Sequence, residues 1–460
     1  MKIFQNLAKR TEQMTPEKSD NQNKLFEPLL EPILNDKHPL YKLASSINWV
    51  TVEKELSCCY SPDMGRPGNA TRLMTGLHYL KHAYDESDES VVARWVENPY
   101  WQYFCGYEHM QHEFPIHPTS MVKWRRRVGS DRMEILLKET FSTAVREKYI
   151  KPSDASMIIV DTTVQEKAIA HPTDAKLYFK SIHRLVKLAK ERNIKLRQSY
   201  VRVSKKAYFN QTKYARACQY KRAAKYTKKL KTILGRLIRD IKRKAADPDK
   251  ELALMLERTS RIHSQKRDDS NKLYSLDAPE VECISKGKTY KRYEFGCKVS
   301  ISVTHKNNWI TSSTAVHGNP YDGHTLSETI ERSQANTNVA VQEVYVDRGY
   351  RGHDYTGDAK IYKRDGRLKI LTRTLLNKLK RRSAIEPTIG HLKTDNRMDR
   401  NYLKGDEGDR LNAILAGAGY NMRKLIAAFL YALMEFIRFL RIQLSEITKG
   451  LSASGFIRQN

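Results

Sequence analysis

Two short apolar runs in this chain each end in an aspartate. Residues 157–160 (MIIV) lead into Asp161, and residues 344–346 (VYV) lead into Asp347. Short apolar runs rich in β-branched residues are typical of buried strands. Because parallel strands end at one edge of a sheet, the pattern predicts an α/β fold in which two carboxylates converge at that edge.

A third acidic residue, Glu386, lies in a basic stretch that is expected to be helical. Pro387 follows it, and proline fits best in the first turn of a helix, so Glu386 is expected near a helix start. Lys393 comes nearly two turns later, on the same face. Arg382 precedes Glu386 by four residues, but the proline makes pairing with Lys393 the stronger expectation.

The order of these elements indicates an RNase H-like fold. A strand with Asp161 precedes strands expected at 293–304 and 309–316, then a helix, a strand with Asp347 and a helix with Glu386. Hard oxygen donors of this kind suit Mg²⁺, with Mn²⁺ as a substitute. Two such cations about 4 Å apart can activate the attacking oxygen and stabilise the leaving oxygen in phosphoryl transfer.

The chain is too long, at 460 residues, for one ordinary core. The composition along it predicts a flexible N-terminal segment, a helical DNA-binding domain, an RNase H-like catalytic domain with a long basic helical insertion, and C-terminal helices. The expected bounds are 1–35, 36–150, 157–400 with the insertion at 176–270, and 405–460.

The formal net charge of +30 favours a polyanionic partner. Between residues 176 and 244 there are 24 Lys and Arg against two acids, with tyrosines interleaved. Such a surface can neutralise phosphates and stack on bases, although a basic run can also be a solvated face. The expected DNA contacts in the insertion are Lys221, Arg222, Lys225, Lys228, Lys229 and Lys231.

A second basic segment follows Pro118 and ends at Gly129. It is either the recognition helix of a helix-turn-helix, with Lys123, Arg125, Arg126 and Arg127 facing DNA, or a packing helix with a solvated basic face. The spacing does not decide between them. The aromatic residues between 95 and 104 favour a core over a base-stacking platform.

The six cysteines show no zinc-type spacing and no disulfide framework, which fits a reduced, intracellular setting. No secretory leader is expected at the N-terminus. The apolar stretch 425–434 is shorter than the roughly 20 residues that a membrane span needs, and predicts a buried core helix in a soluble protein.

Several long stretches, in order, resemble bacterial insertion-sequence transposases of the DDE class, specifically the family numbered five. They are GRPGNATRLMTGLHYLKHAY, VVARWVENPYWQYFCG, VDTTVQEKAI, KLYSLDAPEVECISKGK, YEFGCKVSI, GNPYDGHTL, VYVDRGYRG and IEPTIGHLKTDNRMDRNYLKG.

The resemblance implies that Asp161, Asp347 and Glu386 bind metal. The family signature Tyr-x2-Arg-x3-Glu-x6-Lys falls on Arg382, Glu386 and Lys393, with Leu379 in place of the tyrosine. It also implies double-stranded DNA as partner, a homo-oligomer on paired ends, and a cytoplasmic, nucleoid-associated location without a membrane. Whether His391, Asp322 or Arg348 assists the site stays open.

These observations predict a DNA transposase that cuts at inverted-repeat ends and transfers strands into target DNA. A structure-selective nuclease of the same fold would share the acids but would not join DNA. A non-enzymatic basic nucleic-acid-binding protein would be indifferent to metal and to Glu386. Short inverted repeats flanking the gene would favour the transposase.

Overall fold

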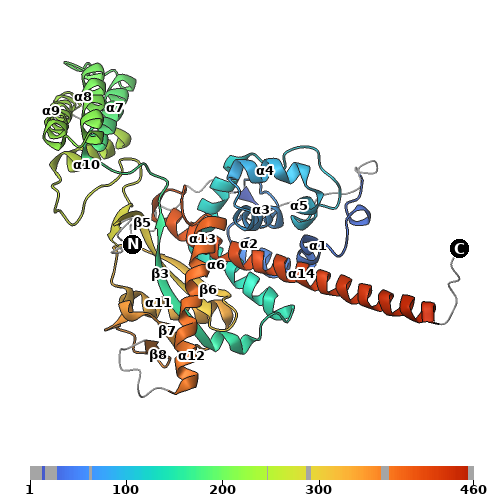
Figure 1. The fold of residues 1–460 in the computed structure, drawn as a ribbon. Helices are drawn as coiled ribbons and strands as arrows, with labels where there is room; N and C mark the ends of the chain where they lie inside the picture. Colours follow the sequence, from blue (N-terminus) through green and yellow to red (C-terminus); the bar gives the residue numbers. More distant parts are fainter. Residues whose placement is uncertain are drawn as a thin grey trace.

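The computed structural model describes residues 13–15, 28–61, 65–245, 247–285, 292–363 and 372–453, and the chain forms a mixed α/β body with a helical bundle set apart from it (Figure 1). The expectation of a flexible segment over 1–35 lies mostly outside the described residues. Within its described part, Leu30 is fully buried.

A curled sheet lies at the centre of the body. Its strand order is β4-β5-β3-β7-β8, with β6 paired to β5. Strand β3 is antiparallel to β5 and parallel to β7, which is parallel to β8. The bounds are β3 Met157–Glu166, β4 Glu282–Ser285, β5 Tyr293–Thr304, β6 Ile310–Val316, β7 Glu343–Val346 and β8 Lys360–Lys363.

The structure confirms strands at the positions expected for β3, β5, β6 and β7, but β3 does not end at Asp161. It continues to Glu166 because Thr162–Glu166 pair with β5 from Ser300 back to Gly296. A side chain at Gly296 would have no room, since a Cβ there would lie 1.9 Å from the carbonyl oxygen of Gln165. Glycine therefore allows β3 to extend past the acidic residue.

The two faces of the sheet are covered by different helices. Successive strand residues point to opposite faces, so Ile159 packs in the core shared with the N-terminal helices and α14, whereas Ile158 and Val160 pack on the side of α11. Helix α11 spans Leu326–Thr337, between β6 and β7, where a helix was expected. Asp161 therefore shares the face of Ile159, and Thr162 shares the other.

The N-terminal helices share one apolar core with the sheet. Their bounds are α1 Pro39–Ser46, α2 Trp49–Ser57, α3 Thr71–Ala83, α4 Asp88–Glu97, α5 Pro99–Phe104 and α6 Pro118–Arg146. Trp95, Trp101 and Phe104 are buried, which confirms their expected core role. Gly129 breaks α6 with φ 75°, as expected, but the helix resumes beyond it.

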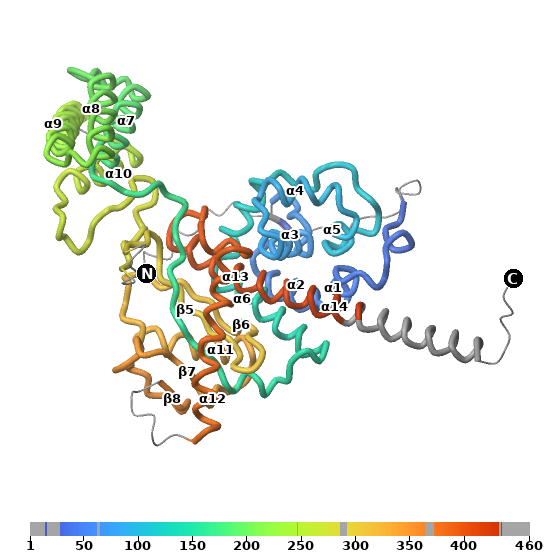
Figure 2. Tube along the Cα trace, viewed as in Figure 1, coloured from blue at the N-terminus to red at the C-terminus, as the bar shows by residue number. Residues whose placement is uncertain are grey.

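The insertion is a bundle of four helices with its own core, visible as the separate green unit in Figure 2. The helices are α7 Asp174–Glu191, α8 Val201–Arg216, α9 Tyr220–Lys244 and α10 Lys250–Ser264. Tyr200, Tyr208 and Tyr226 pack against that core, whereas Tyr220 is exposed. Most of the interleaved tyrosines are thus packing residues rather than a base-stacking surface.

The described C-terminal part is one long helix, α14 Gly405–Ala453. Leu425 and Phe429 are buried, but Leu430, Tyr431 and Met434 are exposed. The expected buried core helix at 425–434 is therefore correct only for its first half, because the helix runs past the body that it packs on. Among the described helices, none is long and apolar enough to cross a bilayer.

Candidate active site at the sheet edge

Asp161 lies in the middle of β3, beside the point where the parallel strand β7 ends. Its side chain is 19% exposed. Its Oδ1 atom accepts a hydrogen bond of 2.8 Å from the backbone amide of Thr162. The carboxylate is thus held by its own strand while one side remains open to solvent.

Asp347 follows β7 directly and caps the short 3-10 helix Arg348–Tyr350. Its Oδ1 accepts a hydrogen bond of 2.8 Å from the amide of Gly349. Burial, together with the negative charges of Asp161, Asp322 and Asp347, raises the pKa of Tyr350 well above its ordinary value. Three carboxylates therefore gather near the buried Tyr350 side chain.

Glu386 is in the first turn of α13 Ile385–Asp395, as expected. Helix α13 buries Ile385, Thr388 and Leu392 on the sheet face that carries Ile159. This packing leaves Glu386 at the surface, 63% exposed, at the edge where Asp161 lies.

Arg382 joins two members of the expected triad. Its guanidinium lies 3.3 Å from Glu386 Oε1 and 3.8 Å from Asp161 Oδ2. Residues 382–384 form a 3-10 turn directly before α13, so Arg382 lies one turn before Glu386 along the chain. The structure thus shows the Arg382 pairing that the sequence ranked second. Lys393 lies in the last turn of α13 and is partly buried.

Asp322 is a further acid at this edge that the sequence left open. It begins the 3-10 turn Asp322–Thr325 before α11, and its Oδ1 accepts hydrogen bonds from Lys298 Nζ and Thr162 Oγ1, both at 2.9 Å. The sequence signal for Asp322 is its place in the stretch GNPYDGHTL. By contrast, His391 pairs with Asp395 on its own helix at 2.9 Å.

The chemistry of the donor set fits a hard divalent cation, since every candidate ligand is a carboxylate. In the described arrangement, however, no three acidic, histidine or cysteine side chains surround one point closely enough to bind a metal. The Arg382 guanidinium supplies positive charge between Asp161 and Glu386 instead. Asp161, Asp347 and Glu386 would therefore have to move closer together to hold a cation.

The basic stretch of α6 divides into buried and exposed residues. Arg125 is buried and forms two hydrogen bonds, of 2.8 and 2.6 Å, with the carboxylate of Asp88. This placement corrects the expectation that Arg125 faces DNA, because Arg125 is buried and its guanidinium forms an ion pair with Asp88. Lys123 and Arg126 are exposed, and Arg127 lies over the Tyr60 ring at 5.6 Å.

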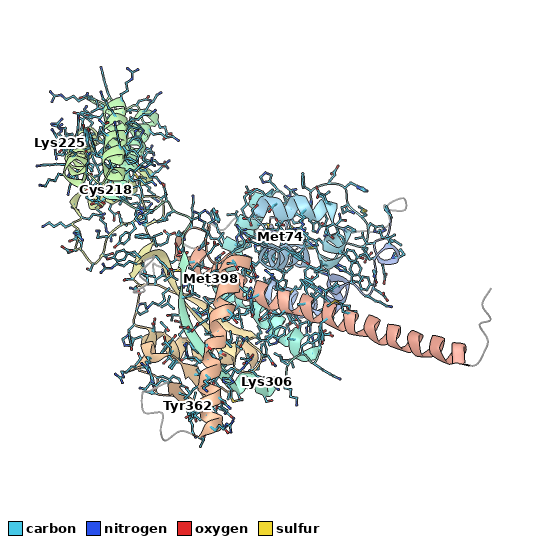
Figure 3. All side chains as sticks on the ribbon, viewed as in Figure 1. Met74, Cys218, Lys225, Lys306, Tyr362 and Met398 are labelled. Atoms are coloured by element: carbon cyan, nitrogen blue, oxygen red, sulfur yellow. The ribbon has the colours of Figure 1, made fainter. Side chains whose placement is uncertain are left out.

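The insertion presents most of its expected DNA contacts to solvent. Five of the six side chains are exposed and Lys231 is partly buried, the exposed ones being Lys221, Arg222, Lys225, Lys228 and Lys229. Lys225 projects from the bundle in Figure 3. Within the described residues, none of the six forms an ion pair, whereas Arg184 and Arg192 pair with Glu251.

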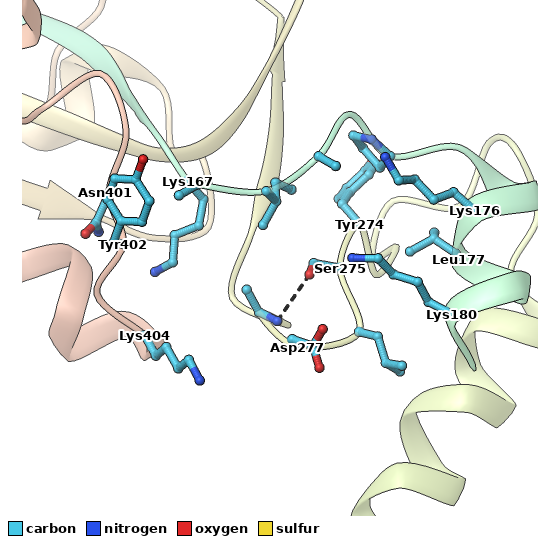
Figure 4. Close-up of a pocket in the computed structure, with 16 residues that line it drawn as sticks. Lys167, Lys176, Leu177, Lys180, Tyr274, Ser275, Asp277, Asn401, Tyr402 and Lys404 are labelled. Atoms are coloured by element: carbon cyan, nitrogen blue, oxygen red, sulfur yellow. Dashed lines mark hydrogen bonds between the residues drawn. The ribbon is translucent and has the colours of Figure 1, made fainter. Parts of the chain in front are cut away.

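A cavity of about 200 Å³ lies where the insertion joins the body (Figure 4). Lys167 and Lys404 lie on the body side, and Lys176 and Lys180 come from α7. Lys167 is neutralised by Glu280 at 2.8 Å and Asp409 at 2.7 Å. The described lining includes no member of the carboxylate cluster, so this cavity is separate from the site at the sheet edge.

Two family models match the chain. One, described as "Transposase domain (DUF772)", matches residues 28–127, and the other, "Transposase DDE domain", matches residues 257–422. Together the two matches indicate an insertion-sequence transposase. The first match covers the N-terminal helices of this transposase as far as Arg127. The second covers Asp347 and Glu386, while Asp161 lies between the two matched segments.

A relative from Rhizobium meliloti, "Uncharacterized protein ORF8 in nfe locus", is 49% identical to the transposase over 202 residues. The match spans 44% of this chain and 97% of the relative. No solved structure matches the transposase.

Proposed function

We propose that this transposase cuts DNA at the inverted-repeat ends of an insertion sequence and joins those ends to target DNA. Two observations carry the proposal, in a chain with a transposase DDE domain: Asp161 and Asp347 both lie near Tyr350, and Arg382 links Asp161 to Glu386. Carboxylates that converge at a strand edge are what metal-dependent phosphoryl transfer requires.

The proposal includes an RNase H-like core and membership of the insertion-sequence family numbered five. Support for the core comes from the order β3, β5, β6, α11, β7 and α13, and from a central β3 that is antiparallel to β5 and parallel to β7. Support for the family comes from the sequence stretches around the three acids. The division into domains expected from the sequence is part of the same proposal.

Each residue has a proposed role in the reaction. Asp161 in the middle of β3 and Asp347 at the end of β7 would hold Mg²⁺ or Mn²⁺, and Glu386 would complete the ligand set from α13. A bound divalent cation supplies Lewis acidity for the attacking and leaving oxygens. Arg382 and Lys393 would hold the scissile phosphate.

The chemistry proceeds in two balanced transfers. A water oxygen bonds to phosphorus at the element end, and the 3′ oxygen leaves as a hydroxyl. That 3′-OH then bonds to a phosphorus of the target and displaces a second 3′ oxygen. The same carboxylates can serve both transfers, because a 3′ oxygen of DNA is the leaving group in each.

Double-stranded DNA would contact the exposed basic surfaces of α6 and the insertion. Lys123, Arg126 and the exposed insertion cations would neutralise backbone phosphates. A homo-oligomer would hold two ends together during the joining step.

The test is a cleavage assay on DNA that carries the gene's own flanking sequence, with Mg²⁺. We expect wild type to cut and Asp161→Asn to lose at least a hundredfold in rate. The matched control is Asp354→Asn, which removes an exposed carboxylate in the loop after Asp347. Equal rates for wild type and Asp161→Asn would refute the proposed site.

A further inference from the structure

Asp322 is held from two directions at the edge of the sheet. Lys298, which is buried in β5, donates to Asp322 Oδ1 at 2.9 Å and to the carbonyl oxygen of Pro320 at 2.6 Å. Thr162, the residue after Asp161 in β3, donates its hydroxyl to the same Oδ1 atom. One lysine therefore fixes the turn before α11 to the sheet.

Thr162 connects Asp322 to the first acid of the proposed triad. Its hydroxyl binds Asp322, and its amide binds Asp161 Oδ1 at 2.8 Å. The two contacts lie on opposite sides of the strand, because Asp161 and Thr162 point to different faces. Thr162 therefore links the Asp322 carboxylate to the Asp161 carboxylate through two hydrogen bonds.

Asp322 also approaches the second acid of the triad. A Cβ built on Gly349 would lie 2.9 Å from Asp347 Oδ1 and 3.4 Å from Asp322 Oδ2. The two carboxylates thus border the same small space, which the missing side chain of Gly349 leaves open. The oxygen of Asp322 that faces this space is the one that Lys298 and Thr162 do not hold.

We propose that Asp322 is a positioning residue of the carboxylate site, which aligns Asp161 through Thr162 and borders Asp347 across Gly349. The inference rests on the proposed metal-dependent function and deepens it. Neighbours that orient metal ligands typically affect metal affinity by 10- to 100-fold when they are mutated. A purely structural ion pair with Lys298 would affect folding stability instead.

The test is a calorimetric titration of the full chain with Mn²⁺ in the absence of DNA, which measures the Mn²⁺ affinity directly. We expect Asp322→Asn, which keeps an oxygen for Thr162 but loses the charge, to weaken Mn²⁺ binding about tenfold. Thr162→Val should weaken it in the same direction. Asp354→Asn, in the exposed loop beyond Gly349, serves as the matched control and should bind like wild type.

If a variant is less stable, a second measurement separates weaker Mn²⁺ binding from partial unfolding. Thermal unfolding identifies variants that are folded at the titration temperature, and Asp322→Glu keeps the charge while moving the carboxylate. Wild-type Mn²⁺ affinity in folded Asp322→Asn, with weakened binding in Asp161→Asn, would overturn the inference and leave the proposed function intact. Unchanged binding in Asp161→Asn and Asp347→Asn as well would overturn both.

Discussion

Arg382 lies with its guanidinium 3.8 Å from the carboxylate of Asp161, although the two residues are more than 200 positions apart in the chain. The same guanidinium reaches Glu386 at 3.3 Å. One cation thus spans an acid on the central strand and an acid on α13. The Arg382 guanidinium thus places a positive charge between Asp161 and Glu386, where a divalent cation would place its own.

This relationship predicts that Arg382→Gln tightens Mn²⁺ binding by a few fold, because a competing positive charge is removed from the carboxylates. Glu386 is largely exposed and Asp161 is 3.8 Å from the guanidinium, beyond hydrogen-bond distance, so the free energy of unfolding should change by about 1 kcal/mol or less. Calorimetric titration and denaturant unfolding measure the two quantities. Weaker Mn²⁺ binding in the variant would instead mean that Arg382 organises the ligands.

Arg125 and Arg126 are neighbours on α6 with opposite environments. Removing Arg125 leaves the mostly buried Asp88 carboxylate with Lys81, at 2.7 Å, as its remaining ion-pair partner, so Arg125→Ala should destabilise the protein by about 1.5–3 kcal/mol. Arg126→Ala should change stability by at most about 0.5 kcal/mol but lower the salt slope of DNA binding by about one. Chemical denaturation and salt titration separate these effects. Equal destabilisation by both variants would contradict the assigned burial.

His78 gives the N-terminal helices a pH-dependent stability. Burial and the charge of Arg125 lower its pKa from 6.5 to about 3. Between these values the unfolded chain binds a proton that the folded chain does not, so stability falls as pH falls, by up to about 1.4 kcal/mol per pH unit. His78→Gln should reduce this slope between pH 6 and 4 in denaturant unfolding. A slope equal to wild type would show that His78 does not titrate as its burial requires.

The insertion lysines predict a change in the salt dependence of DNA binding. Replacing Lys228, Lys229 and Lys231 by glutamine should lower the slope of log affinity against log salt by about one unit per lost phosphate contact. The control variant Arg184→Gln removes a cation that is paired with Glu251 and should change the slope less. A slope unchanged by the triple variant would remove this part of α9 from the DNA interface.

The elements that carry the acids could be predicted from local sequence alone. The apolar run of β7 and the proline after Glu386 placed a strand end and a helix start, and the structure has both. The extent of β3 could not be predicted in this way. Its length depends on Gly296, which lies far along the chain and permits the close approach of β5.

The partners of charged residues were harder to predict, because they depend on tertiary packing. Nothing in the basic run of α6 shows that Arg125 meets Asp88 from another helix. Likewise, Asp322 meets Lys298 only through the pairing of β3 with β5 and the turn before α11. Such contacts require the sheet register, which short sequence patterns do not specify.

The most direct test of the proposed strand transfer uses a DNA end that has already been cut to expose its 3′-OH, together with target DNA and Mg²⁺. The substrate bypasses the first cleavage, so the assay reports joining alone. Wild type should form the joined product, and Glu386→Gln should form at least a hundredfold less. Joining by both proteins would contradict the role of Glu386, and cutting of the target without joining by wild type would indicate a nuclease.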